Sequence, residues 1–182
     1  MRRGRKAPDS DLESRLTSTH RANAPDLLRF IGRRVETPED AADVLAETFL
    51  VAWRRIQHMP FTDTEARMWL YGIAKNTSTN WNRSAHRRNS LSDSLRDQIR
   101  HAPQTYEPIS PSSLDVQRAL DKLPPSHREL TILVHWDGFT IAEAGIILEL
   151  PEATARSRYY KAKQLLRLEL SEEAPSEAAV HQ

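Results

Sequence analysis

The sequence predicts an all-α protein made of two small helical domains joined by a flexible linker. Apolar residues recur at the period of an amphipathic helix through most of the chain. The composition agrees with this, because only 5 of the 182 residues are Gly and 38% are hydrophobic. The periodicity weakens between Asn89 and Ser113, a stretch with several Ser and Pro residues that we interpret as the linker. At most one short helix is expected in it, near Leu91 to Ile99.

We expect five segments along the chain, and the second helical domain to be a helix-turn-helix domain. The predicted segments are a disordered basic tail at 1–9, a first helical domain at 10–90, the linker at 91–112, the second helical domain at 113–171 and a loose polar tail at 172–182.

Charge and composition exclude several classes of protein. The net charge is only +1, so any affinity for nucleic acid must come from local patches. The chain has no Cys, which excludes disulfides and thiolate metal sites, and we expect no metal and no cofactor. No apolar run could cross a membrane, and the basic N-terminus has no secretory apolar segment, so a cytoplasmic protein is expected. Paired-His motifs and Gly-rich phosphate loops are absent, and no enzymatic activity is expected.

The last two predicted helices are the most informative part of the chain. Thr140 is a good N-cap, and Glu143 completes a capping box for a short helix from Ile141 to Leu148. Pro151 suits the first turn of a longer helix that runs to about Leu170. A tight turn joins the two helices.

The longer helix has two distinct faces. Its predicted buried stripe comprises Ala155, Tyr159, Ala162, Leu166 and Leu170. The opposite face carries Ser157, Tyr160, Lys161 and Gln164, flanked by Arg156 and Arg167, and no acid occurs between Ala153 and Leu168. Such a face suits the DNA major groove, although a solvated basic face on an ordinary helical hairpin has the same pattern. The candidate DNA-reading residues are Arg156, Ser157, Arg158, Tyr160, Lys161 and Lys163.

Two further helices are expected before this pair. Ser113 is the predicted cap of the first, and Ser126 with Glu129 forms a predicted capping box for the second. Asp137-Gly138 is a turn signal. The predicted core residues are Leu114, Leu120, Leu123, Leu130, Leu133, Val134 and Trp136.

The first domain should begin with a helix from Leu12 to Val35, with a break or a new first turn near Ala24 because Pro25 follows. Its expected apolar stripe is Leu27, Leu28, Ile31 and Val35, with Arg29, Arg33 and Arg34 solvated.

The next helix should start at a Thr37 N-cap followed by Pro38 and run to about Gln57. Its predicted core stripe is Leu45, Phe49, Ala52, Trp53 and Ile56. The other face mixes acids with aliphatic residues, which indicates either a docking surface for a basic protein or capping acids with scattered surface apolar residues. That face carries Asp40, Asp43, Glu47, Leu50, Val51 and Arg54.

A long third helix should run from Glu65 to about Arg88, capped by Asp63 or Thr64. Cations with neighbouring aromatic and amide side chains suit a DNA strand, although cations at a frayed helix end also complement the helix dipole. The predicted core side is Ala66, Trp69, Leu70, Ile73, Thr77 and Trp81, and the predicted outer side is Met68, Tyr71, Lys75, Thr79, Asn82, Arg83 and His86.

The helix-turn-helix segment resembles the promoter-reading segment of bacterial sigma factors of the extracytoplasmic-function (ECF) type. The matching residues are Thr140, Ala142, Glu143, Leu148, Pro151, Thr154, Ser157, Arg158, Ala162 and Leu166. The turn usually carries Gly, where this chain has Glu149, and the small residue before it, usually Ala, is Gly145. A non-Gly residue in a left-handed turn costs about 1 kcal/mol. The resemblance implies that this domain reads the minus-thirty-five promoter element.

The resemblance extends to the run DAADVLAETFLVAW, which is similar to the segment by which ECF sigma factors bind core RNA polymerase. Asp40, Asp43, Glu47, Thr48 and Phe49 match, whereas Ala46 replaces the usual Gln. The resemblance implies that this face docks on the clamp helices of the largest-but-one polymerase subunit. The implied contact residues are Asp40, Asp43, Glu47, Leu50 and Val51.

The run ARMWLYGIAKNTSTNW resembles the segment that recognises and opens the minus-ten element. The family likeness implies that a base flipped from the non-template strand enters a pocket made by the loop Met59 to Thr64, Asn76 and Asn80, although Asn80 falls near the apolar side of a helical wheel. It also implies a linker that threads toward the RNA exit path. The implied minus-ten residues are Lys75, Asn76, Thr79, Asn80, Arg83, Arg87 and Arg88.

These features together predict an ECF-type sigma factor that binds core RNA polymerase and directs promoter recognition, melting and initiation. Its expected partners are core polymerase, promoter DNA and an anti-sigma factor, without insertion into a membrane. Two alternatives remain open: a helix-turn-helix regulator that acts without polymerase, and a sigma-mimicking protein that sequesters an anti-sigma factor.

Overall fold

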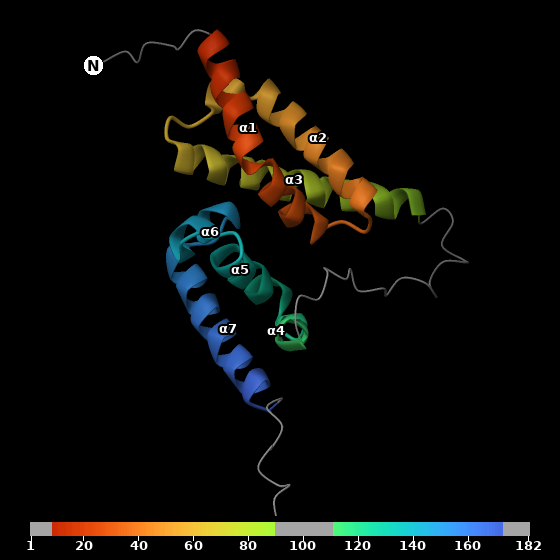
Figure 1. Ribbon diagram of the computed structural model, residues 1–182, viewed down its shortest axis with the longest axis vertical. Coiled ribbons are helices and arrows are strands. Elements are labelled where there is room, and N and C mark those ends of the chain that lie inside the picture. Colours follow the sequence, from red (N-terminus) through yellow and green to blue (C-terminus); the bar gives the residue numbers. More distant parts are fainter. Residues whose placement is uncertain (1–8, 90–110, 173–182) are drawn as a thin grey trace, which may run out of the picture. The chain divides into compact units, whose positions relative to one another are not determined.

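The computed structural model describes residues 9–89 and 111–172, and every regular element within these two stretches is helical. The chain divides into two compact units, one with helices α1 to α3 and one with helices α4 to α7 (Figure 1). The prediction of an all-α protein with two helical domains is therefore confirmed. Most of the predicted linker and tails, with the helix expected near Leu91 to Ile99, lies outside the described residues.

The first unit consists of α1 (Asp9–Gly32), α2 (Pro38–Arg54), the short 3-10 helix η1 (Ile56–His58) and α3 (Asp63–Asn89). Each of the three long helices packs against the other two. Large side chains fill the space between them, and the rings of Phe30 and Tyr71 meet edge to face with centroids 4.7 Å apart. The core is thus a three-helix contact with aromatic residues at its centre.

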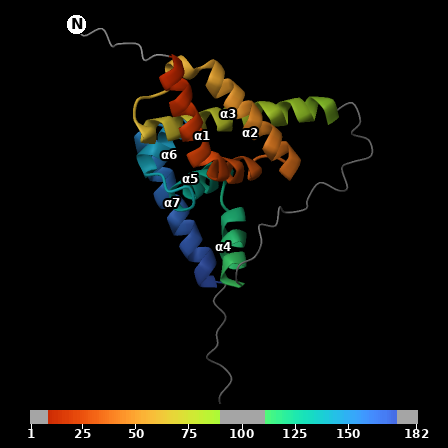
Figure 2. The ribbon, with the colours of Figure 1, turned by 45° about the horizontal axis from the view of Figure 1, so that its top comes forward.

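Helix α1 does not break at Pro25, contrary to the prediction. It is continuous through Pro25, and its axis bends part-way along (Figures 1 and 2). Proline removes one backbone hydrogen bond and kinks a helix, which is compatible with continuation when neighbours hold the helix. The predicted stripe was wrong at Leu28, which is exposed, while Phe30 is fully buried. Arg34 is half-buried, because its guanidinium stacks on the Phe30 ring and donates to the Phe30 carbonyl.

Helix α2 starts as predicted, since the Thr37 hydroxyl accepts from the Asp40 amide at 3.0 Å. It ends at Arg54 instead of Gln57, and η1 follows. The predicted core stripe was displaced by one residue, because α2 contacts both α1 and α3 and its buried arc lies between them. Thr48 is buried because its hydroxyl donates to the Val44 carbonyl at 2.7 Å. The buried residues of α2 are Ala41, Val44, Thr48 and Ala52, whereas Trp53 is 49% exposed and Leu45, Phe49 and Ile56 are half-buried.

Helix α3 is capped by Thr62, not by Asp63 or Thr64. The Thr62 hydroxyl accepts from the Glu65 amide at 3.2 Å and donates to the Glu65 carboxylate at 2.8 Å. Tyr71, predicted to point outward, is fully buried against Phe30. The buried residues of α3 are Ala66, Leu70, Tyr71, Ile73, Ala74 and Ser78, whereas Trp69, Thr77 and Trp81 are half-buried.

The second unit consists of α4 (Pro111–Asp121), α5 (Pro125–His135), α6 (Ile141–Ile147) and α7 (Glu152–Glu172). Helix α4 begins at Pro111, so Ser113 is not its cap. The capping box predicted for Ser126 and Glu129 is also wrong, because α5 begins at Pro125 with Pro124 as its N-cap and no side-chain cap. Proline is pre-organised for the first position of a helix, which explains the earlier starts of both helices.

Helix α7 is the centre of the second unit and packs against α4, α5 and α6. Leu120 and Leu123 pack on Ala162, and an ion pair between Lys122 and Glu169 closes the edge of this contact. The predicted core was wrong at the two ends of the unit. Trp136, just after α5, is 54% exposed, and Leu170, in the last turn of α7, is 39% exposed.

Candidate DNA-reading and protein-docking surfaces

The turn between α6 and α7 is built from local hydrogen bonds. Thr140 and Glu143 form the predicted capping box, in which the Thr140 amide donates to the Glu143 carboxylate at 2.8 Å. At the other end of α6, the amide of Leu150 donates to the carbonyl of Gly145 at 2.8 Å, and that of Glu149 donates to the carbonyl of Ile146 at 3.1 Å. This pair of bonds is a Schellman motif.

Glu149 occupies the left-handed position of that motif with a φ of 56°, so the turn has the usual backbone without its usual Gly. Gly145 has a different role. A Cβ atom at Gly145 would lie 3.1 Å from the Cβ of Ala155, which is tighter than ordinary contact. The two small residues therefore let α6 cross close to α7.

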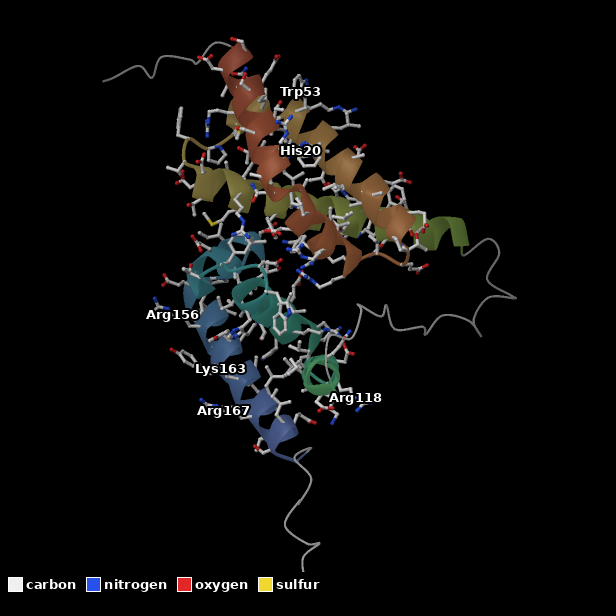
Figure 3. All side chains as sticks on the ribbon, in the orientation of Figure 1. His20, Trp53, Arg118, Arg156, Lys163 and Arg167 are labelled. Atoms are coloured by element: carbon white, nitrogen blue, oxygen red, sulfur yellow. The ribbon has the colours of Figure 1, made fainter. Side chains whose placement is uncertain are left out.

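The outer face of α7 is presented to solvent as predicted. Arg156 and Arg167 project from α7 on the side away from α4, where Arg118 lies (Figure 3). Arg156 forms an ion pair with Glu152 one turn earlier. Of the six candidate DNA-reading residues, Arg156, Ser157, Tyr160 and Lys161 are exposed, and Arg158 and Lys163 are half-buried.

His127 on α5 is influenced by the positive charges of this surface. Burial lowers the pKa of His127 below its ordinary value, and the neighbouring cations Arg158 and Lys161 lower it further. The basic side chains of α7 therefore create a positive potential that reaches α5.

A second surface lies on α2. Asp43 is exposed, Leu50 is 50% exposed, and Glu47 and Val51 are half-buried. Two carboxylates and two aliphatic side chains thus share one face, as predicted. Arg54 approaches Glu47 at 3.9 Å, a distance at which a surface pair contributes little.

Asp40 differs from the other acids of α2. Its carboxylate accepts a hydrogen bond of 3.1 Å from the indole N–H of Trp81 on α3, and the residue is half-buried. The two residues line a small cavity of about 80 Å³ together with Glu36, Asn82 and Ala85. Asp40 thus joins the start of α2 to the second half of α3.

A third surface runs along α3. Asn76, Thr79, Asn80 and Arg83 are all exposed, and their spacing places them on one face of the helix. The wheel position of Asn80 near the apolar side was therefore misleading. Lys75 is half-buried, and Arg87 and Arg88 belong to the last turn of α3.

The loop before α3 is held from a distance. The guanidinium of Arg15 on α1 donates to the carbonyls of Pro60 and Phe61, at 2.9 and 3.0 Å. Met59 is buried on one side and Thr62 caps α3 on the other, yet the side chain of Phe61 is 85% exposed. The loop therefore has a fixed backbone and a freely presented aromatic ring.

Comparison with known proteins identifies the family. The model of Sigma-70 region 2 matches residues 19–98, and that of Sigma-70, region 4 matches residues 113–166. The ECF RNA polymerase sigma factor SigL of Mycobacterium tuberculosis is 31% identical over 153 residues, covering 82% of this chain and 85% of the relative. The chain belongs to the sigma-70 family, among its ECF members.

Other relatives of this sigma factor agree. The ECF RNA polymerase sigma factor SigE of Mycolicibacterium smegmatis is 29% identical over 151 residues, covering 81% of this chain and 58% of the relative. The fold resembles that of the sigma factor RpoE of Bartonella quintana, solved with the anti-sigma factor NepR, with a TM-score of 0.65 and 24% identity. That match covers 90% of this chain and 98% of the other.

Sequence reasoning missed four notable residues of this sigma factor. Arg15 on α1 supports the loop before α3, Phe61 lies in that loop, and His135 and Tyr159 lie beside the outer face of α7. An exposed Phe between Pro and Thr could have been noticed, but the partners of Arg15 and His135 lie far along the chain. Within the described residues, no helix could span a membrane and no cluster of side chains could hold a metal ion.

Proposed function

We propose that this chain is a cytoplasmic sigma factor that binds core RNA polymerase, directs it to promoters and assists strand opening. The observation that supports this most strongly is that region 2 and region 4 of the family occur in one chain, each with an exposed surface of suitable chemistry. A regulator acting without polymerase would have no use for the acidic and aliphatic face of α2. A sigma mimic that binds no DNA would have no use for the basic face of α7.

The α2 face is the proposed polymerase contact. Asp43 and Glu47 supply negative charge for a basic partner, and Leu50 and Val51 supply apolar area that water would otherwise cover. Asp40 belongs to the proposed contact as well, but its bond to Trp81 gives it a second role. Through that bond, docking on α2 would steady the DNA-facing half of α3.

The α3 face and the loop before it are the proposed contact with the minus-ten element. Amide groups of Asn76 and Asn80 can hydrogen-bond to the edge of an unpaired base, and Lys75, Thr79 and Arg83 can follow the phosphates. Arg87 and Arg88, which belong to the last turn of α3, are included in the proposed contact. Capture of an extruded base costs a few kcal/mol of unstacking, so it couples sequence recognition to melting.

The α7 face is the proposed contact with the minus-thirty-five element. Its first half would enter the major groove, where Arg156, Ser157 and Tyr160 reach base edges. Arg158, Lys161 and Lys163 would meet phosphates or further base edges. Because the sigma factor RpoE of similar fold was solved in complex with an anti-sigma factor, we also propose an anti-sigma partner for this chain.

Run-off transcription with core polymerase on a pool of genomic promoters tests the proposal. Specific transcription starts that require the chain are expected. The double variant Asp43→Lys/Glu47→Lys should lose core binding in a pull-down while its helical circular dichroism is unchanged. The matched control Asp11→Lys/Glu13→Lys makes the same charge change on exposed residues of α1 and should keep core binding.

Each outcome of this experiment separates the candidates. DNA binding without core binding would favour the regulator, and anti-sigma binding without either would favour the mimic. Core binding by the Asp43→Lys/Glu47→Lys variant at the wild-type level would overturn the assignment of the α2 face.

A further inference from the structure

Four ring-bearing side chains form a continuous row from the end of α5 to the outer face of α7. The ring of His135 lies nearly parallel to that of Tyr159, with centroids 5.8 Å apart and an interplanar angle of 23°. Tyr159 meets Tyr160 edge to face at 6.0 Å, and Trp136 meets His135 at 6.3 Å on the other side. We call these four residues the aromatic row.

A hydrogen bond fixes the centre of the row. The Tyr159 hydroxyl lies 3.0 Å from Nε2 of His135. A ring contact and a hydrogen bond between the same two side chains restrict both torsion angles of Tyr159, since the hydroxyl can reach Nε2 only from a narrow range of ring orientations. The orientation of Tyr159 is thus set by a residue of another helix.

The backbone that carries His135 is itself well held. His135 is the last residue of α5, and the following amide of Trp136 donates to the carbonyl of Ile132 at 2.9 Å. A further bond of 3.0 Å joins the amide of Phe139 to the carbonyl of Leu133. On the other side, Tyr159 lies on α7 between Ala155 and Ala162, which are both fully buried. The row therefore rests on two fixed supports.

Tyr160 is the end of the row on the outer face of α7, with 60% of its surface exposed. Helical spacing places it at the middle of the outer face, beside Arg156, Ser157 and Gln164. These neighbours supply charges and hydrogen-bonding groups, whereas the ring of Tyr160 supplies apolar area. In the major groove, the apolar feature that distinguishes one base pair from another is the thymine C5-methyl group.

We propose that His135 is a positioning residue that, through Tyr159, holds the ring of Tyr160 for contact with thymine methyl groups of the minus-thirty-five element. The inference rests on the proposed function and adds a specificity-determining contact and its support. Without His135, Tyr159 gains rotational freedom, so the ring against which Tyr160 packs is no longer held in one orientation.

Replacement of thymine by uracil tests this directly, because it removes only the methyl group. The full-length chain with core polymerase is bound to a promoter found by run-off transcription, with each minus-thirty-five thymine replaced in turn. For the wild type, we expect replacement at one or two positions to lower the promoter affinity about fourfold, the value for burial of one methyl-sized group. Tyr160→Ala should bind thymine and uracil promoters equally.

Variants of the support separate positioning from folding. Tyr159→Phe keeps the ring and removes the hydrogen bond, and His135→Ala removes both contacts. Both should reduce the thymine-to-uracil ratio toward one while the salt dependence of binding stays unchanged. His135→Gln retains a group that can bond to the Tyr159 hydroxyl and should restore much of the ratio. The control Arg118→Ala, on α4, should leave the ratio at the wild-type value.

The outcomes also separate this inference from the proposed function. If the holoenzyme shows no preference for any promoter, the proposed function fails. A selective holoenzyme that tolerates uracil at every position would overturn the role of Tyr160. A wild-type ratio in His135→Ala and Tyr159→Phe, with unchanged thermal unfolding, would overturn the positioning role of His135.

Discussion

The two helices proposed to face DNA, α3 and α7, are preceded by turns of different construction. The turn before α7 is held by backbone hydrogen bonds between residues no more than five positions apart, with Glu149 in the left-handed position. The loop before α3 is held by Arg15, which lies 45 residues before Pro60 in the chain. One turn is a local structure, and the other depends on the packing of α1 against its neighbours.

This difference predicts different sensitivities. A local turn should survive changes elsewhere in the unit, since its bonds need only the residues of the turn. A loop held at long range should lose its shape when one distant side chain is removed, even if its own sequence is intact. Substitutions in each turn, in its support and in the helix that follows it can test this contrast.

The largest effect is expected on the outer face of α7, the helix that follows the local turn. Arg156→Ala should relax the preference at one base pair of the minus-thirty-five element, at a cost of up to about 3 kcal/mol, because Arg is suited to bidentate contact with guanine. Lys163→Ala should weaken binding to all sequences alike. It should also lower the slope of log affinity against log salt concentration by about one. Binding of the full-length chain with core polymerase to a library of mutated elements, across salt concentrations, measures both.

A uniform loss of affinity in both variants would show that Arg156 contacts phosphate. Base reading would then pass to Ser157, Tyr160 or Lys161. Glu152 provides a further check, because its ion pair with Arg156 must open for DNA contact. Glu152→Gln should therefore strengthen binding slightly, since a surface ion pair of this kind is weak.

The second prediction concerns the long-range support of the loop before α3. Arg15→Ala should lower the free energy of unfolding of the first unit by about 2 kcal/mol, because two carbonyls lose a charged donor. It should also slow strand opening, measured by permanganate reactivity of unpaired thymines. Arg15→Lys keeps the charge but cannot span both carbonyls, so it should recover little of either effect.

Opening at the wild-type rate in Arg15→Ala would mean that the loop keeps its shape without Arg15. The comparison variant is Asn76→Ala, which leaves the loop untouched and should slow opening without loss of stability, because Asn76 is exposed. If neither variant affects opening, the face of α3 does not contact the melted strand.

Local construction also explains which features were predictable from the sequence. The caps at Thr37 and Thr140, the turn at Glu149 and the exposed face of α7 follow from neighbouring residues, and all were predicted correctly. Helix α7 is covered along one side, so its amphipathic pattern identifies which face is buried and which is exposed.

The errors arose where packing decides the outcome. Helix α2 has neighbours on two sides, and its buried arc includes Thr48, whose polarity argued against burial. Tyr71 is buried because it meets Phe30 from α1, and the pattern of α3 alone could not show this. The hydrogen bonds from Arg15 to the loop and between His135 and Tyr159 each join two residues that lie far apart in the sequence. Neither pair belongs to a repeating pattern, so hydrophobic periodicity could not reveal it.

The third prediction tests the cost of the unusual residue in the local turn. Glu149→Gly should stabilise the second unit by about 1 kcal/mol, because Gly adopts a positive φ without steric penalty. Chemical unfolding measures the change. Gly145→Ala is the contrasting variant and should destabilise, since its new Cβ would crowd Ala155. A destabilised Glu149→Gly variant would show that interactions of the Glu149 side chain outweigh the backbone strain.

The smallest expected effect concerns two histidines, one in each unit. Burial lowers the pKa of both, with a further contribution from Arg21 for His20 and from Arg158 and Lys161 for His127. A lowered folded pKa means that the unfolded chain binds more protons below pH 6.5, the ordinary value. Each histidine therefore contributes stability that is present above that pH and is lost as the pH falls through the folded pKa. His20→Gln and His127→Gln should each reduce this loss.

Promoter DNA should separate the two histidines. Phosphates beside Arg158 and Lys161 would offset the positive potential at His127, so the pKa of His127 should rise when a minus-thirty-five duplex binds. Burial and Arg21 lower the pKa of His20, which lies in the unit that this duplex does not contact, so that pKa should stay constant. Titration of the histidine ring resonances by NMR, with and without the duplex, measures both. A constant pKa at His127 in the bound state would place the phosphates away from Arg158 and Lys161, and the DNA path along α7 would then follow Arg156, Lys163 and Arg167 on the other edge of the helix.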